Sequence, residues 1–269
     1  MNSRPFGADG IEVSEVGLGC WQLGGDFGPM GEETGLEILR TAAESGITFF
    51  DTADVYGNGR SEALIGRFLR KSDGGILVAT KFGREDDVYP DGYTEAALRR
   101  CADDSRRRLG VDRLELLQLH CVPPSVLRDG TIFDGLRTLV DEGVIARFGA
   151  SVETIDEGLL CLEQEGISSL QVIFNILRQK PAQELLPAAR ESNVSIIVRL
   201  PLASGLLAGK YTVETTFAEG DHRTYNRDGQ AFNVGETFAG LPFEIGAGLA
   251  DEIKPLVPEG MVMAQMALR

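Results

Sequence analysis

Residues 46–57, GITFFDTADVYG, combine a predicted strand with a candidate functional site. The apolar run at residues 47–50 has the β-branched and aromatic content typical of a buried strand, and it ends at the carboxylate of Asp51. The phenol of Tyr56 follows in the next few residues. Functional groups often lie in loops held by a rigid strand, so this segment predicts a site. The alternative is a surface turn, because Asp is a common turn residue and Tyr often packs a loop.

The composition is that of a globular α/β protein. The chain has 269 residues, of which 43% are hydrophobic, enough for one large domain or two ordinary ones. A formal net charge of -15 repels nucleic acid and anionic lipid. Neither a signal peptide nor a run of apolar residues long enough to span a membrane is recognisable. We therefore expect a cytoplasmic protein with no nucleic acid and no membrane among its partners.

The cysteines do not predict a disulfide framework or a zinc knuckle, because none of them forms a CxxC pair. They are Cys20, Cys101, Cys121 and Cys161. Cys121 lies beside His120, but the only other histidine, His222, is far away in the sequence. Adjacent strand residues also point to opposite sides of a sheet. We therefore expect no metal site.

Strand and helix patterns alternate along most of the chain. Residues 4–6 and 11–13 flank a glycine-containing turn, which predicts an N-terminal β-hairpin. Strands are then predicted at residues 16–20, 48–51, 76–81, 114–120, 146–151, 170–175 and 195–199. Helices are predicted at residues 34–45, 61–70, 94–109, 132–142, 154–165 and 182–192, and again at 243–256 and 261–269. Glycines just beyond several helices and threonines at two helix starts support these boundaries. No linker divides the alternation, so one domain over residues 1–269 is expected.

This alternation predicts a parallel sheet, either open and doubly wound or closed as a (β/α)8 barrel. A doubly wound dinucleotide fold needs G-x-G-x-x-G after its first strand, and the nearest stretch, GLGCWQLG at residues 17–24, has its third glycine misplaced. The barrel is therefore favoured. The segment 200–242 is rich in Gly, Thr and Asn and is expected to be a long irregular loop.

Chemically active side chains occur where the predicted strands end. In a barrel these ends share one face, and there they would gather Trp21, Asp51, Lys81, His120, Cys121, Ser151, Asn175 and Arg199, with Tyr56 close behind Asp51. A phenol with a pKa of about 10 is a poor acid at neutral pH, and a nearby ammonium lowers that pKa. A carboxylate keeps the ammonium charged, and a neutral imidazole can orient a carbonyl. The group therefore predicts proton transfer.

Six segments, in this order, resemble the aldo-keto reductase superfamily: GITFFDTADVYG, GRSEALIG, LVATKFG, LELLQLH, GVIARFGAS and RLPLASGLLAGKY. The resemblance extends from about Gly17 to Arg269. It implies a (β/α)8 TIM barrel that reduces aldehydes or ketones with a nicotinamide cofactor, usually NADPH, with NADH left open. The ending MVMAQMALR resembles the helix before the eighth strand, so we expect the last βα unit to be missing from this chain. A longer chain or a second copy is expected to cover the open strand edges.

The resemblance also implies a role for each site residue. Tyr56 would be the general acid that protonates the carbonyl oxygen as hydride arrives at carbon. Lys81 would lower the pKa of Tyr56, Asp51 would pair with Lys81, and His120 would orient the carbonyl. The implied cofactor contacts are Ser151 and Gln171 at the nicotinamide carboxamide, and Leu200, Leu202, Gly205 and Lys210 in the loop over the pyrophosphate. Trp21 and Cys121 are predicted to line the substrate pocket.

Two residues depart from the family pattern. Arg199 stands where an aromatic residue commonly stacks on the nicotinamide. A planar guanidinium can stack there as well, but its positive charge predicts weaker binding of the oxidised cofactor. Val152 stands where Asn is usual, which removes one contact to the carboxamide.

The leading hypothesis is an oxidoreductase that transfers hydride from NADPH to a small aldehyde or ketone. One alternative is a nicotinamide-binding regulatory or partner-binding module with negligible turnover. A Schiff base at Lys81 is less favoured, because it needs a neutral amine and Asp51 would keep Lys81 charged. The expected partner is a small carbonyl substrate, and association into a homo-oligomer is left open.

Overall fold

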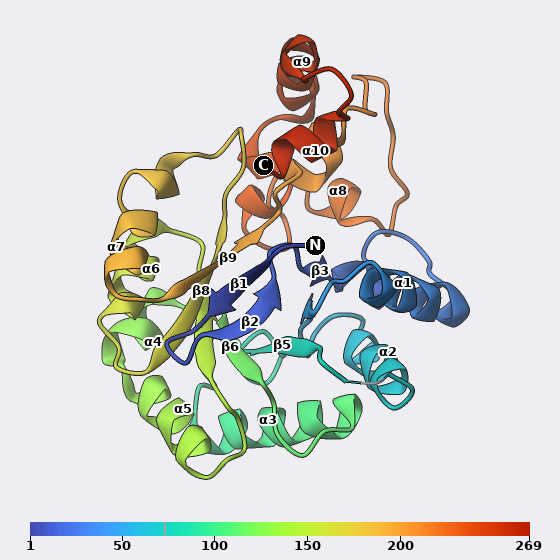
Figure 1. The fold of residues 1–269 in the computed structure, drawn as a ribbon. Helices are drawn as coiled ribbons and strands as arrows, with labels where there is room; N and C mark the ends of the chain where they lie inside the picture. The colour runs from blue at the N-terminus through green and yellow to red at the C-terminus, as the bar shows by residue number, and fades with distance from the viewer. Residues whose placement is uncertain (73) are drawn as a thin grey trace. The chain divides into compact units, whose positions relative to one another are not determined.

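The structure is a computed structural model that describes residues 1–72 and 74–269. It divides into two compact units, one made of Met1–Gln171 and Pro187–Ile197 and the other of Val172–Leu186 and Val198–Arg269 (Figure 1). Each unit is described separately below. The interpretation of residues 1–269 as one domain stays a prediction.

The expected hairpin opens the chain. Strands β1 (Ser3–Phe6) and β2 (Ile11–Ser14) pair antiparallel, with Phe6 opposite Ile11. Phe6 packs against Phe49, with 5.4 Å between their ring centroids, in a cluster that also holds the first residues of the next two strands, Leu77 and Leu116. The hairpin therefore covers the amino ends of these strands, opposite the ends where the predicted site residues lie.

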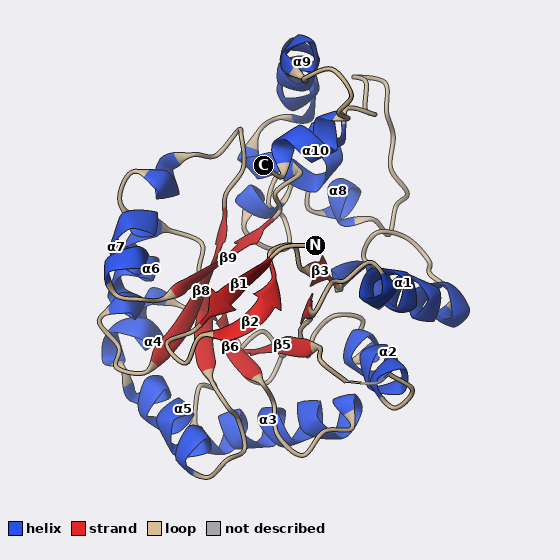
Figure 2. Ribbon diagram, viewed as in Figure 1, coloured by secondary structure: helices blue, strands red, loops and turns tan. Residues whose placement is uncertain are grey.

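Seven strands form one sheet (Figure 2). They are β3 (Leu18–Gly19), β4 (Phe49–Asp51), β5 (Leu77–Phe82), β6 (Leu116–His120), β7 (Phe148–Ser151), β8 (Ile167–Ile173) and β9 (Ser195–Arg199). The strands lie in sequence order, and the pairs from β3 to β8 are parallel. A doubly wound sheet would reverse its order at a switch point. The order confirms the (β/α)8 barrel class, of which the described residues supply seven strands.

The helices of the barrel pattern follow the strands as predicted, with boundaries that differ by a few residues. They are α1 (Glu32–Glu44), α2 (Arg60–Leu69), α3 (Glu95–Leu109), α5 (Thr131–Asp141), α6 (Ile155–Leu162) and α7 (Leu185–Glu191). Thr94 caps α3 by accepting a hydrogen bond from the Ala97 amide, and Gly110 ends it at a φ of 70°. A capping box of Thr154 and Glu157 starts α6. Among the described residues, no helix is long and apolar enough to cross a membrane.

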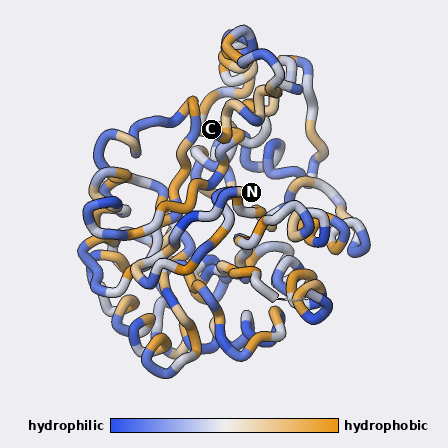
Figure 3. Tube along the Cα trace, in the orientation of Figure 1, coloured by the Kyte–Doolittle hydropathy of each residue, from blue (hydrophilic) through white to orange (hydrophobic). Residues whose placement is uncertain are grey.

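Two short helices were not predicted, and one strand begins earlier than predicted. The 3-10 helix η1 (Trp21–Gly24) and helix α4 (Pro124–Asp129) are too short to show a helical hydrophobic period. Strand β8 begins at Ile167, directly after Gly166, and not at residue 170 as expected. In Figure 3 the strands are largely hydrophobic, whereas hydrophobic and hydrophilic residues alternate along the helices, as expected for helices that cover a buried sheet.

The second unit corrects the expectation of an irregular segment at residues 200–242. It contains η2 (Lys180–Ala182), η3 (Ala203–Ala208), α8 (His222–Tyr225), η4 (Val234–Glu236), η5 (Phe238–Gly240), α9 (Phe243–Ile253), η6 (Lys254–Leu256) and α10 (Met263–Ala267). Its core includes Leu206, Leu207, Phe238, Phe243 and Met263. Leu206, Leu207 and Phe238 come from turns of three to six residues, so no period marks them in the sequence.

Candidate active site

Four of the predicted residues meet at the carboxyl ends of three adjacent strands. Asp51 ends β4, Lys81 lies one residue before the end of β5, and His120 ends β6. Tyr56 lies in the turn between β4 and α2. The strands are paired in parallel, so these ends share one edge of the sheet, which is where a barrel carries its site.

Lys81 is the centre of the group. Its Nζ donates to Asp51 Oδ2 at 2.9 Å and to the Thr52 carbonyl at 2.7 Å, and it lies 3.4 Å from the Tyr56 hydroxyl oxygen. The side chain is 1% exposed. Burial alone would lower the pKa of Lys81, but the charges and hydrogen bonds of Asp51 and Tyr56 outweigh burial and raise that pKa. Lys81 therefore remains an ammonium at neutral pH.

Asp51 is held from two sides. Lys81 binds its Oδ2, and the Gln118 amide donates to its Oδ1 at 3.1 Å. Gln118 is fully buried in β6, and it stands opposite Lys81 in the register of β5 and β6. Gln118 was not predicted as a site residue, although an amide inside the apolar run LLQLH was a usable signal.

Tyr56 lies between two rings. Trp21 stacks on it with 5.9 Å between centroids and an interplanar angle of 25°. His120 meets it edge-on, with 5.9 Å between centroids and an angle of 84°. The chain after Tyr56 is packed tightly, because Gly57 approaches the backbone of Gly24 so closely that a Cβ would lie 2.4 Å from the Gly24 oxygen. Trp21, Tyr56 and His120 thus form one continuous aromatic surface.

Buried hydrogen bonds fix the start of α2 against the strand ends. Ser61 donates to the Cys20 carbonyl at 2.8 Å, and Thr52 donates to Ser61 Oγ at 2.8 Å. Arg84 makes a second connection: its Nε donates to the His120 carbonyl at 3.1 Å, and its guanidinium pairs with Glu153 at 3.0 Å. These contacts restrict the loops that carry Tyr56 and His120. Sequence patterns did not indicate either set of contacts.

Ser151 and Gln171 form a buried polar pair on β7 and β8. They are opposite each other in the strand register, and Ser151 Oγ donates to Gln171 Oε1 at 3.2 Å. Within the described part of the chain, the buried Gln171 Nε2 has no hydrogen-bond partner. A buried amide nitrogen without an acceptor is costly, and a carboxamide oxygen would satisfy it. The pair therefore fits the carboxamide of a nicotinamide.

Cys121 follows His120 and is buried. Its φ is 47°, and its thiol lies 3.6 Å from Ser151 Oγ. Val152, next to Ser151, is buried as well. The role of Cys121 as a residue that lines the substrate pocket stays a prediction.

The remaining predicted cofactor residues belong to the second unit and run from the end of β9 through η3 to the residues just after it. They are Arg199, Leu200, Leu202, Gly205 and Lys210. Leu200 has a φ of 54°, and its carbonyl accepts a hydrogen bond from Asn175 at 3.0 Å. Arg199 pairs with Glu236 at 3.1 Å. The negative charge of Glu236 therefore offsets the positive charge of Arg199. That positive charge was the reason for predicting weaker binding of the oxidised cofactor.

Comparison with known proteins identifies the family. Residues 15–269 match the family model described as Aldo/keto reductase family. The chain is 34% identical over 214 residues to "Probable aldo-keto reductase 1" of Glycine max, covering 78% of this chain and 62% of that protein. It is 32% identical over 235 residues to "Aldo-keto reductase yakc [NADP(+)]" of Schizosaccharomyces pombe, covering 82% of this chain and 67% of that protein.

A solved structure agrees with this result. The glycerol dehydrogenase of Gluconobacter oxydans superposes with a TM-score of 0.80 at 28% identity, over 98% of this chain and 81% of that one. The protein belongs to the aldo/keto reductase family. The chain spans a little under two thirds of the length of the Glycine max relative.

Proposed function

We propose that the protein reduces small aldehydes or ketones with NADPH, with Tyr56 as the proton donor. The observation that carries this proposal is the position of Lys81 Nζ, 3.4 Å from the Tyr56 hydroxyl and 2.9 Å from Asp51. Membership of the family and the NADP(+) in the name of the Schizosaccharomyces pombe relative support the choice of reaction and cofactor. NADH remains the alternative cofactor.

In the proposed reaction the cofactor supplies a hydride to the carbonyl carbon. The Tyr56 hydroxyl donates its proton to the carbonyl oxygen, and the adjacent Lys81 ammonium stabilises the phenolate that forms. Asp51 keeps Lys81 charged and in place. His120 donates a hydrogen bond to the carbonyl oxygen, and Trp21 and Cys121 line the substrate pocket.

The proposed cofactor contacts follow from the polar groups described above. Ser151 and Gln171 would bind the nicotinamide carboxamide, because Gln171 Nε2 is buried and lacks an acceptor among the described residues. Arg199 is proposed to stack on the nicotinamide. Leu200, Leu202, Gly205 and Lys210 are proposed at the pyrophosphate. The test of this assignment is Gln171→Leu, which should weaken NADPH binding with little change in global stability.

The decisive experiment follows NADPH absorbance with a panel of small aldehydes and ketones. The panel includes dihydroxyacetone and glyceraldehyde, since the Gluconobacter oxydans neighbour is named a glycerol dehydrogenase. Tyr56→Phe should lower kcat by roughly 10²- to 10⁴-fold, the usual contribution of a general acid. If the wild-type protein reduces none of the substrates faster than Tyr56→Phe does, the proposal is refuted.

The competing function is a nicotinamide-binding module with negligible turnover. Trp21 is the only tryptophan of the chain and stacks on Tyr56, so quenching of its fluorescence reports a ligand bound beside Tyr56. Saturable quenching by NADPH without consumption of any carbonyl substrate would favour this alternative. Quenching together with turnover favours the reductase.

A further inference from the structure

A second cluster of reactive side chains lies apart from Lys81 and His120. Asp54 comes from the loop after β4, Glu85 from the loop after β5, and Cys101 from α3. A carboxylate oxygen of Asp54, one of Glu85 and the sulfur of Cys101 all lie within 4.8 Å of one another. The proposed reduction uses none of these three groups.

The cluster holds an unsatisfied buried carboxylate. Asp54 is 2% exposed, and its Oδ1 accepts a hydrogen bond from the Val55 amide at 2.8 Å. Its Oδ2 is buried and has no hydrogen-bond partner in residues 1–72 and 74–269. Burying a carboxylate oxygen without a donor is costly, so this atom indicates a ligand that the side chains do not provide.

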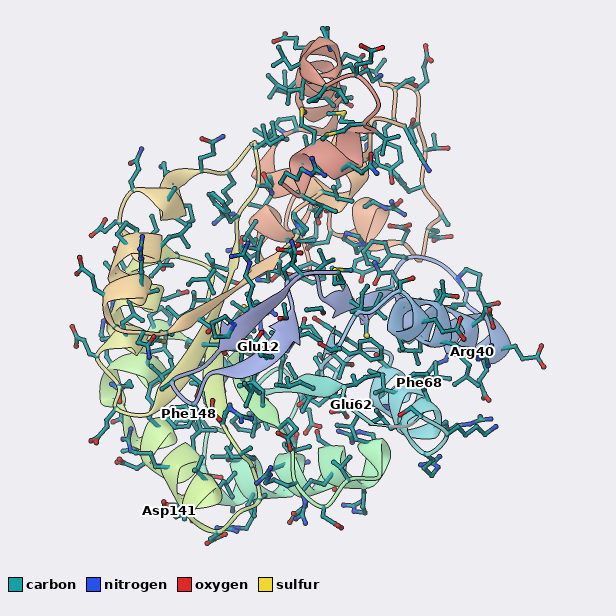
Figure 4. The ribbon with its side chains drawn as sticks, viewed as in Figure 1. Glu12, Arg40, Glu62, Phe68, Asp141 and Phe148 are labelled. Carbon is teal, nitrogen blue, oxygen red and sulfur yellow. The ribbon has the colours of Figure 1, made fainter. Side chains whose placement is uncertain are left out.

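The surroundings of Asp54 favour a positive ligand. The negative charges of Glu62 and Glu85 act on Asp54, and the positive charge of Arg108 opposes them. Arg108 is already paired with Glu62, which lies on α2 (Figure 4). Arg100 pairs with Glu85 at 3.2 Å. Since these arginines already have carboxylate partners, Asp54 has no cation of its own among the residues that the structure describes.

We propose that Asp54, Glu85 and Cys101 bind one thiophilic divalent cation of the Zn²⁺ class. Carboxylate oxygen and thiolate sulfur are ligands that Zn²⁺ accepts, whereas Mg²⁺ and Ca²⁺ prefer oxygen alone. Cys101 Sγ lies 3.1 Å from Glu85 Oε2. In a tetrahedral zinc site, bond lengths of 2.0–2.3 Å place neighbouring ligands about 3.5 Å apart, so small side-chain rotations suffice.

The chemistry of binding is a replacement of protons by the cation. The Cys101 thiol releases to solvent the proton that now lies in its hydrogen bond to Glu85, and a protonated Asp54 carboxyl releases its proton in the same way. The thiolate and both carboxylates then become ligands. Glu85 gives access from the surface, because its side chain is 21% exposed. The bound cation would join the loops after β4 and β5 to α3 and so stabilise the folded protein.

The test begins with the purified wild-type protein, stripped with a chelator and titrated with Co²⁺. Binding at Cys101 should produce a sulfur-to-cobalt charge-transfer band that saturates at one equivalent. Zn²⁺ should then remove the band and raise the thermal midpoint. A wild-type protein that shows no such band would overturn the proposal, whatever the variants do.

Matched variants show which side chains bind the cation. Cys101→Ser should abolish the band and weaken Zn²⁺ binding by roughly tenfold or more, since even an outer-shell partner contributes that much. Asp54→Asn, which keeps the side-chain shape, should weaken Zn²⁺ binding as well. The control is Cys161→Ser, which removes another buried thiol, in α6. A band that survives Cys101→Ser, or that disappears with Cys161→Ser, would refute the assignment even if the other variants failed to fold.

Discussion

The Gln118 amide donates to Asp51 Oδ1 at 3.1 Å, while the bond from Lys81 goes to Oδ2 of the same carboxylate. Asp51 is therefore fixed between the middle of β6 and the end of β5. This relationship gives Gln118 a positioning role, because the direction of the Asp51 carboxylate determines where the Lys81 ammonium meets Tyr56.

Gln118→Leu should lower kcat by roughly tenfold and leave the affinity for NADPH unchanged. The change removes one hydrogen bond to a charged group, which typically contributes about 1.5–3 kcal/mol to stability. Steady-state kinetics and urea unfolding measure the two effects. Gln183→Leu, at an exposed position, is the control and should change neither. A kcat equal to wild type in Gln118→Leu would contradict the role given to Gln118.

The ion pair of Lys81 and Asp51 predicts that removing both charges destabilises the protein less than removing the Lys81 charge alone. Lys81→Met leaves the Asp51 carboxylate, which is only 17% exposed, without its ammonium and should cost about 3–5 kcal/mol. The double variant Lys81→Met/Asp51→Asn removes both charges and should be more stable than Lys81→Met alone. Both variants should lack reductase activity. Urea unfolding decides the point, and a double variant less stable than Lys81→Met would count against the pair.

Asp221 predicts part of the acid sensitivity of the protein. Its carboxylate caps α8 and pairs with Arg223. Burial would raise the pKa of Asp221, but the hydrogen bonds and charge of Arg223 outweigh burial, and the pKa lies below its ordinary value of 3.8. A lowered pKa contributes stability above pH 3.8, and this stability is lost as the pH falls through the lowered pKa.

Asp221→Asn should therefore be less stable than wild type at pH 7, by about 2 kcal/mol. The difference should shrink as the pH falls below about 4, because the wild-type carboxylate then becomes protonated as well. Urea unfolding at several pH values, followed by circular dichroism, measures this convergence. A difference that stays constant down to pH 2 would show that Asp221 acts through its shape and not through its charge.

The sequence predicted the shared face because strand ends can be read locally. The run before Asp51 marks one strand, and the runs before Lys81 and His120 mark two more, so a parallel sheet brings these residues to one edge. The contacts that Gln118 and Arg84 make in the site could not be read in this way. Their contacts depend on the register between β5 and β6 and on side-chain direction, which no local period records.

Residues 200–242 of the second unit were misread for a different reason, whereas the helices predicted at 243–256 and 261–269 are present as α9, η6 and α10. The core residues of the misread segment, such as Leu206 and Phe238, come from turns with left-handed backbone, where neither a period of 3.6 residues nor one of two applies. Glycine and polar residues between them look like a loop. Burial in this segment follows from tertiary contacts that form only when the chain folds.

Gly57 and Gly10 offer a matched pair that separates backbone strain from close packing. Both have a positive φ, 58° for Gly57 and 64° for Gly10. A Cβ at Gly10 would have no atom within 4 Å, whereas a Cβ at Gly57 would lie 2.4 Å from the Gly24 carbonyl oxygen. Gly10→Ala should therefore cost only the strain of a left-handed residue, about 1–2 kcal/mol. Gly57→Ala should cost clearly more and should also lower kcat, because the backbone shift displaces Tyr56. Urea unfolding measures the loss of stability in each variant. Equal losses would show that the backbone after Tyr56 can shift at no extra cost and that its contact with Gly24 does not hold the proposed proton donor in place.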